Sequence, residues 1–211
     1  NLTTNGTFPR TTEKTVTEWA KLIVPITTDV KISWNGSTAE TSQKVMLKLN
    51  FEEVVSNVKE FIRIRDEHFA KTGYYCRITF QLTFMQNNMH ELADIVKLAA
   101  ELGVDRVKGH QLWAHFDEIK NLSMKETPES ITKWNEYVKQ AYDSQSKFCK
   151  PNGEKVILEN IIPLQQNEDK EIPESYECPF LEKELWISAT GKYSPCCAPD
   201  ELRKELGDFG T

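Results

Sequence analysis

Apolar residues recur every three to four positions in several stretches of the chain, the spacing that gathers them on one face of a helix. The first predicted helix covers Thr12–Val24 and ends at Pro25, because a proline disfavours helical geometry in the residue before it. The second is expected after Asn50, a favoured N-cap residue whose capping-box partner is Glu53, three positions on.

Two further helices carry similar signals. The third is expected after Asn88, with Glu91 in the capping-box position, and Gly103 lies where helices commonly end on a glycine. The fourth is expected from Pro128, because proline is favoured in the first turn of a helix and Thr127 before it can act as the cap.

Shorter runs in which apolar and polar residues alternate lie between these helices, a pattern typical of strands. The predicted strands are Leu2–Thr4, Asp29–Trp34, Tyr75–Met85 and Val104–Lys108. Strand and helix alternate four times with connections long enough for crossovers, which predicts an α/β fold with a parallel sheet and helices outside it. Four units are too few to close an eight-stranded barrel, so we expect a partial (β/α) barrel.

The predicted strands end in short polar segments. These segments are Thr4–Gly6, Ser33–Gly36, Met85–Asn88 and Gly109–Gln111. In parallel (β/α) barrels the active site gathers at the carboxyl ends of the strands, so the segments are a candidate ligand-binding rim. Ordinary turns have the same composition and are the alternative for each segment. His110 in the last of them fits a surface histidine better than a ligand-facing one.

The chain has 211 residues, with 26 Lys and Arg against 32 Asp and Glu, a net charge of −6. This mild acidity argues against nucleic acid or an anionic membrane as the partner. No apolar run reaches the roughly 18 residues that a membrane helix needs. The length fits one large domain, or one domain with a small annex. Because the chain opens at Asn1 without methionine or a leader, we expect it to begin partway through a domain.

The cysteines bear on the cellular compartment. They are Cys76, Cys149, Cys178, Cys196 and Cys197. An odd number spread over a chain of this length is a poor disulfide framework, and the cluster near the end favours metal or cluster ligation in a reducing cytosol. Sequons at Asn1, Asn5, Asn35 and Asn121 point the other way, but so short a pattern arises often by chance. We expect a cytoplasmic protein.

The last third of the sequence changes character. Residues 149–177 are polar and carry a strand pattern only at Val156–Leu158, so we expect a linker there. The linker separates a barrel-like part, residues 1–148, from a small annex, residues 178–211.

The annex predicts a hairpin, with strands Leu185–Ala189 and Lys192–Ser194 about a turn at Gly191. Such a hairpin brings cysteines that are distant in sequence to one end. The annex cysteines are Cys178, Cys196 and Cys197. Thiolates grouped in this way suit zinc or an iron–sulfur cluster, and three buried, inert cysteines are the alternative.

The spacing of the annex resembles the start of a SPASM domain, the auxiliary iron–sulfur extension of many radical S-adenosylmethionine (SAM) enzymes. Twelve residues separate Cys178 from Gly191, and four separate Gly191 from Cys196. Leu2–Thr7 is similar to the third strand of the radical SAM partial barrel, and Val30–Gly36 to its fourth. Arg77–Asn88 and Asp105–Leu112 match the fifth and sixth strands less tightly.

One departure from the family is decisive. Its chemistry needs a Cys-x-x-x-Cys-x-x-Cys loop that holds a 4Fe–4S cluster, and this sequence contains neither that spacing nor the family's Gly-Gly-Glu stretch. The resemblance therefore implies part of a radical SAM oxidoreductase without its first two βα units. We expect this part alone to be inactive in generating the radical.

The resemblance also implies roles and partners. Ser33 would contact the SAM ribose, Thr4 and Asn5 would line the rim, and Gln111, just past the last strand, would lie near the adenosine. Cys178 and Cys196 would ligate an auxiliary cluster, with Cys197 as a weaker third ligand. SAM and 4Fe–4S clusters are the implied cofactors. The implied partners are a peptide or protein substrate and an electron donor such as flavodoxin or ferredoxin.

Two alternatives stay open at this point. In one, the annex cysteines hold a structural zinc ion and no redox chemistry occurs. In the other, the chain is a non-catalytic interaction module on a half-barrel.

Overall fold

The computed structural model describes residues 1–8, 14–114, 116–165, 185–187, 190–194 and 207–208. The chain divides into two compact units, Asn1–Gln166 and Asn167–Thr211, called below the first and second units. The predicted metal ligands Cys178, Cys196 and Cys197 lie outside the described residues.

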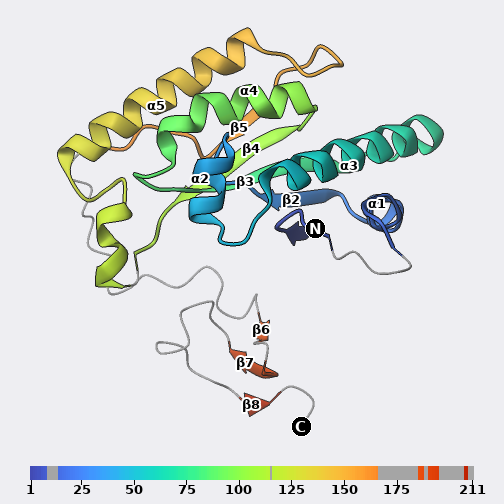
Figure 1. Cartoon of the computed structure of the whole chain (residues 1–211), viewed down its shortest axis with the longest axis horizontal. Coiled ribbons are helices and arrows are strands. Elements are labelled where there is room, and N and C mark those ends of the chain that lie inside the picture. Colours follow the sequence, from blue (N-terminus) through green and yellow to red (C-terminus); the bar gives the residue numbers. More distant parts are fainter. Residues whose placement is uncertain (9–13, 115, 166–184, 188–189, 195–206, 209–211) are drawn as a thin grey trace, which may run out of the picture. The chain divides into compact units, whose positions relative to one another are not determined.

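The first unit is built on a five-stranded sheet in which all strands run parallel, in the order β1-β2-β3-β4-β5 (Figure 1). The strands are β1 (Leu2–Thr4), β2 (Asp29–Ser33), β3 (Arg77–Phe84), β4 (Arg106–Gln111) and β5 (Ile157–Glu159). Spatial order equals sequence order, so each connection advances by one strand. This arrangement confirms the predicted parallel α/β fold and is consistent with a partial barrel.

Five α-helices belong to the first unit among its described residues. They are α1 (Val16–Ile23), α2 (Ala39–Val45), α3 (Phe51–Thr72), α4 (Leu92–Leu102) and α5 (Pro128–Lys147). Short 3-10 turns precede α4, follow α1 and precede α5: η2 (Met89–Glu91), η1 (Val24–Ile26) and η3 (Asp117–Leu122). Helices α3, α4 and α5 lie on the same side of the sheet (Figure 1). Only α2 has no counterpart among the predicted helices, because its composition is mostly polar.

Local capping fixes several helix ends as predicted. The side chain of Asn50 accepts a hydrogen bond from the Glu53 amide at the start of α3. Thr127 does the same for Ser130 at the start of α5, with Pro128 in the first turn. Gly103 ends α4 at φ +85°, a left-handed conformation that glycine adopts without a steric penalty.

The predicted capping box at the start of α4 is wrong. Asn88 does not cap the helix; its amide instead bonds the Met85 N–H and the Thr83 carbonyl at the end of β3. The Glu91 side chain does not bond back to the Asn88 backbone either, because its carboxylate reaches the start of α2. The sequence spacing fits a local box, but Asn88 bonds the end of β3 and Glu91 bonds donors that are 50 or more residues away.

The two faces of the sheet differ in character. Alternate residues of β2, β3 and β4 point to the helices and form the core, with no measurable exposure for Ile32, Ile78, Phe80, Phe84 and Val107. Trp34, just past β2, packs against Phe51 of α3, and Phe84 packs against Trp134 of α5. We call this the helix-covered face.

The fifth strand and the second unit complete the fold. Strand β5 falls inside residues 149–177 and pairs with β4 in parallel register. In the second unit, β6 (Trp186–Ile187) and β7 (Lys192–Ser194) form the predicted antiparallel hairpin, and β8 (Gly207–Asp208) pairs with β7.

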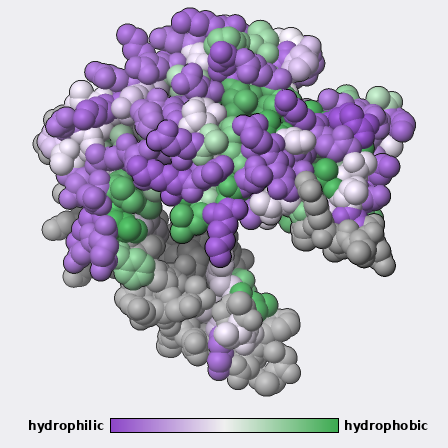
Figure 2. Space-filling model, in the orientation of Figure 1, coloured by the Kyte–Doolittle hydropathy of each residue, from purple (hydrophilic) through white to green (hydrophobic). Residues whose placement is uncertain are grey.

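The face of the first unit seen in Figure 2 is largely hydrophilic, with smaller hydrophobic patches. This agrees with amphipathic helices that turn their polar sides to solvent. None of the described helices is both long and apolar enough to cross a membrane.

Candidate functional site

The second face of the sheet is polar, which is unusual for a parallel sheet, since such sheets are commonly apolar on both faces. We call it the polar face. Its residues are Thr3, Asp29, Lys31, Ser33, Arg77, Thr79, Gln81, Thr83, Arg106, Lys108, His110, Ile157 and Glu159. All of these residues except Ile157 have a polar or charged side chain. A face of this kind costs packing energy and is expected where a ligand binds.

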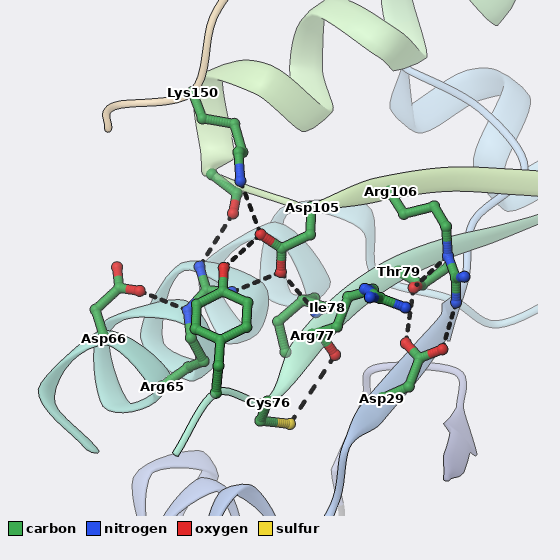
Figure 3. A network of polar contacts seen from close by, with 12 residues as sticks. Asp29, Arg65, Asp66, Cys76, Arg77, Ile78, Thr79, Asp105, Arg106 and Lys150 are labelled. Carbon is green, nitrogen blue, oxygen red and sulfur yellow. Dashed lines mark hydrogen bonds and ion pairs between the residues drawn. The ribbon is translucent and has the colours of Figure 1, made fainter. Parts of the chain in front are cut away.

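The amino-terminal half of the polar face is closed by an ionic network (Figure 3). Arg106 forms ion pairs with Asp29 and Glu159. The Thr79 hydroxyl donates to Asp29 Oδ1 over 2.8 Å and accepts from Arg106 Nε. Lys108 pairs with the same Glu159 and lowers its pKa. Asp29, Thr79 and Arg106 are buried, so this end is structural rather than accessible.

A second ionic cluster lies beside the first, at the same ends of the strands but on the helix-covered side (Figure 3). Asp105 accepts from Arg65 of α3 over 2.7 Å and from Lys150 over 2.9 Å. Burial alone would raise the pKa of Asp105, but Arg65, the Ile78 N–H and Tyr75 outweigh it and lower that pKa. The cluster links α3 to the amino-terminal ends of β3 and β4.

The carboxyl-terminal half of the polar face is more accessible. Ser33, Gln81 and Lys108 lie side by side in one register row across β2, β3 and β4, and all three are partly exposed. Lys31 lies one row nearer the amino-terminal ends, and His110 one row beyond. This half of the face presents hydroxyl, amide, ammonium and imidazole groups to a ligand.

The rim next to Ser33 is held by Glu91, which comes from the turn after β3. Its carboxylate accepts from Ser37 N over 2.6 Å, Ser37 Oγ over 2.9 Å and Thr38 N over 3.2 Å. It also accepts from the hydroxyls of Thr38 and Thr41 over 2.8 and 2.6 Å. Burial would raise the pKa of Glu91, but these bonds outweigh it and lower that pKa. One carboxylate therefore fixes the loop between β2 and α2.

Two further contacts fasten the same loop. Asn35 Oδ1 accepts from the Thr83 N–H over 2.9 Å, which ties the end of β2 to β3. Gly36 lies against α2 so closely that a Cβ there would come within 2.7 Å of the Ser42 amide nitrogen. The glycine in the Asn35–Gly36 pair is thus required by close packing rather than by a turn.

The four residues predicted to bind SAM do not all lie on one face. Ser33 belongs to the polar face. Thr4 is in register with Ile32 of the helix-covered face, and its Oγ1 accepts from Gly6 N. Asn5 is exposed and accepts from Thr7 N and Thr7 Oγ1 in a local turn. Their binding roles stay predictions.

Gln111 requires a correction to its position. It is the last residue of β4 rather than the first residue past it, because β4 begins and ends later than the alternation predicted. It is in register with Phe84 on the helix-covered face, and its Oε1 is buried without a hydrogen-bond partner in the described part of the chain.

The remaining cysteines are apart from this region. Cys76 is fully buried just before β3, at the end of the strand opposite Ser33, and Cys149 is exposed. Burial raises the pKa of the Cys76 thiol, as expected for an inert core residue. Within the ranges that the structure describes, no group of three or more His, Cys, Asp or Glu side chains is arranged to hold a metal ion.

Sequence reasoning missed Lys31, Gln81 and Lys108. Their signal was present, since each is a polar residue in alternation with buried apolar ones, as Lys31 is between Val30 and Ile32. Alternation in a strand that is expected to be parallel is itself the signal, because parallel strands buried on both faces have near-continuous apolar runs.

Five parallel strands in sequential order, with helices over one face and polar groups on the other, are consistent with a partial α/β barrel. Among solved structures, the crystal structure of Streptococcus suis SuiB is similar, with a TM-score of 0.56 and 14% sequence identity. The match covers 96% of this chain and 45% of that chain, so this chain spans less than half the length of SuiB. The likeness supports a fold of the radical SAM type.

No family model matches the sequence, and no curated protein matches it. At 14% identity the similarity to SuiB concerns the fold alone.

Proposed function

We propose that this chain is part of a radical SAM enzyme, which cleaves SAM reductively and abstracts a hydrogen atom from a peptide or protein substrate. The observation that carries the proposal is Ser33, a partly exposed hydroxyl on the polar face at the carboxyl end of β2, within a radical SAM-like fold. In parallel barrels this edge of the sheet is where ligands bind.

The described residues on the polar face at this edge suit a polar ligand. Ser33, Gln81 and Lys108 are level with one another across three neighbouring strands, and all three are partly exposed. Trp34 Nε1 and Gln111 Oε1 are buried without a hydrogen-bond partner among the described residues, but both belong to the helix-covered face and so do not bear on binding at Ser33.

The proposed ligands of the iron–sulfur clusters come from a different part of the chain. Cys76 and Cys149 do not fit as ligands, since one is buried at the opposite strand end and the other stands alone and exposed. Cys178, Cys196 and Cys197 are the proposed ligands of an auxiliary cluster.

In enzymes of this class, bound SAM would supply a 5′-deoxyadenosyl radical and methionine on receiving one electron from a reduced 4Fe–4S cluster. The protein's own contribution is positional. Ser33 would donate a hydrogen bond to a ribose oxygen, and Asn5 and Thr4 would line the neighbouring end of β1. Glu91 would keep the Ser33 rim in place through Ser37 and Thr38, so the ligand meets a preformed loop.

Binding of S-adenosylhomocysteine, a stable analogue of SAM, tests the proposal by calorimetry with the 211-residue chain. Ser33→Ala is expected to weaken binding about tenfold, the effect of one lost hydrogen bond of roughly 1.5 kcal/mol. Ser56→Ala, on the exposed side of α3, is the matched control and should leave the affinity unchanged. Wild-type protein that does not bind the analogue, or equal affinities for the two variants, would contradict the assignment of Ser33.

Metal analysis tests the annex separately. After anaerobic reconstitution with iron and sulfide, the wild-type chain should retain both elements, and a variant with Cys178→Ala and Cys196→Ala should lose them. Cys149→Ala is the control, because that cysteine is exposed and outside the annex. One zinc ion without sulfide in protein purified anaerobically would favour the structural zinc alternative instead.

A further inference from the structure

The polar face carries a local excess of positive charge. Its cations are Lys31, Arg77, Arg106 and Lys108, against the anions Asp29 and Glu159, a net of +2. The chain as a whole has a net charge of −6. Residues 1–166 carry 21 Lys and Arg and 21 Asp and Glu, so the first unit is neutral and the excess belongs to this face. A cationic face on a neutral unit favours an anionic ligand.

The charges are not all equally available. Both carboxylates of the face are engaged by Arg106, and Glu159 is shared with Lys108. Lys31 has no ion pair or hydrogen bond to another side chain in the part of the chain that the structure describes, and neither does Gln81. Lys31 is partly buried as a residue, and long lysine side chains can cover apolar surface while the ammonium group stays accessible.

The register brings three donors around one point. Gln81 of β3 lies between Lys31 of β2 and Lys108 of β4, one row beyond Lys31 and level with Lys108. With strands about 4.8 Å apart and a rise of about 3.3 Å per residue, the Cα atoms of the two lysines are about 12 Å apart. Two long side chains that converge from this distance can hold one small anion over Gln81.

The donor set suits a carboxylate better than a phosphate. Phosphate sites in proteins rely on helix N-termini, backbone nests or free arginines. Here the start of α2 is already occupied by Glu91, and Arg106 is saturated by two carboxylates. Arg77 lies level with Asp29, at the amino-terminal end of the face and two rows from Gln81. Next to Gln81 there remain Lys31 and Lys108, the latter paired with Glu159, and with the side-chain amide they match the charge and acceptors of a single carboxylate.

We propose that Lys31 and Lys108, with Gln81 between them, bind a carboxylate of the substrate, so that the substrate of this face is an acidic peptide. The inference rests on the proposed function in treating the ligand as a substrate. Ser33, level with Gln81, would then lie at the boundary between two parts of the polar face. SAM would bind on the β1 side of Ser33, and the substrate would bind over Gln81 and Lys108.

Fluorescence anisotropy with the 211-residue chain tests this inference. The probe is a fluorescein-labelled Gly-Glu-Gly-Glu-Gly peptide at low salt, about 50 mM, where screening is weak. Its twin with glutamine in place of glutamate should bind at least tenfold more weakly. A variant with Lys31→Gln and Lys108→Gln should bind the acidic peptide about tenfold more weakly than wild type, as expected for lost charge-assisted bonds.

The matched control is a variant with Lys59→Gln and Lys139→Gln, two exposed lysines of α3 and α5. It makes the same change in net charge and should leave peptide binding unchanged. Glu159→Gln gives a result in the opposite direction: it releases Lys108 from its ion pair and should tighten peptide binding severalfold. That gain cannot come from a misfolded variant.

SAM carries a carboxylate as well, so a second titration, with S-adenosylhomocysteine, distinguishes a carboxylate of the substrate from that of SAM. The double lysine variant should bind S-adenosylhomocysteine as tightly as wild type. A loss of analogue binding with peptide binding unchanged would assign the lysines to SAM and overturn the inference, as would equal binding of the two peptides to wild type. If the peptide binds in a lysine-dependent way and the analogue does not bind at all, the inferred site for an acidic peptide stands and the SAM proposal is refuted.

Discussion

The two faces of the first unit's sheet are made of the same strands but follow different rules. Phe80 and Gln81 are neighbours on β3, yet Phe80 is fully buried among helices while Gln81 is partly exposed among charged groups. The helix-covered face is stabilised by apolar burial. The polar face is held at one end by ion pairs and left accessible at the other. The apolar core thus lies on one side of the sheet, and the groups that we propose for binding lie on the other.

The largest effect is expected from breaking the helix-covered face. Phe80→Ala should lower the free energy of unfolding by about 3–5 kcal/mol, because it removes a buried ring and leaves a cavity. Gln81→Ala, one residue away on the polar face, should change it by about 0.5 kcal/mol or less. Urea denaturation followed by circular dichroism measures both. Similar losses for the two variants would refute the division between the faces.

An intermediate effect is expected where the polar face is structural. Asp29→Ala should lower the free energy of unfolding by about 2–3 kcal/mol, because it leaves the buried Arg106 with Glu159 as its remaining carboxylate. Asp117→Ala removes a comparable but fully exposed pair with Lys120 and is expected to have little effect. A stability loss confined to Asp117→Ala would place the supporting ion pairs on the surface instead.

A smaller, pH-dependent effect is expected at the rim. The pKa of Glu91 is lowered in the folded protein, so its stabilising contribution is complete well above its ordinary value of 4.5. The contribution is lost as pH falls below 4.5 through the folded pKa. Glu91→Gln should therefore cost about 1–2 kcal/mol at pH 7 and progressively less in that acidic range. Denaturation curves at several pH values measure the difference.

Glu118→Gln is the control for this experiment, since Glu118 is exposed and its side chain forms no ion pair or hydrogen bond within the described part of the chain. Its stability should track wild type at every pH. A difference between wild type and Glu91→Gln that grows as the solution becomes acidic would contradict the role of the ionised carboxylate.

Much of the fold was predictable because its signals are local. The caps at Asn50 and Thr127 and the left-handed Gly103 depend on atoms a few residues apart, and the sequence contains all of them. Glu91 shows where local reasoning fails. Its spacing from Asn88 fits a capping box, yet its partners are 50 or more residues away in sequence. A pattern of spacing cannot reveal which of two sets of donors a carboxylate will meet.

For the candidate site, the sequence alone determined that polar segments follow the strands and that Ser33 lies at the carboxyl end of a strand. Both can be predicted because the alternation of residues and the order of the strands are properties of the sequence. Only the tertiary structure decided which strand-end residues share a face. Register places Ser33 with Gln81 and Lys108, and sets Thr4 and Gln111 on the opposite side. The physical reason is that a shift of one residue in register exchanges the two faces of a strand, and register is fixed by packing against helices distant in sequence.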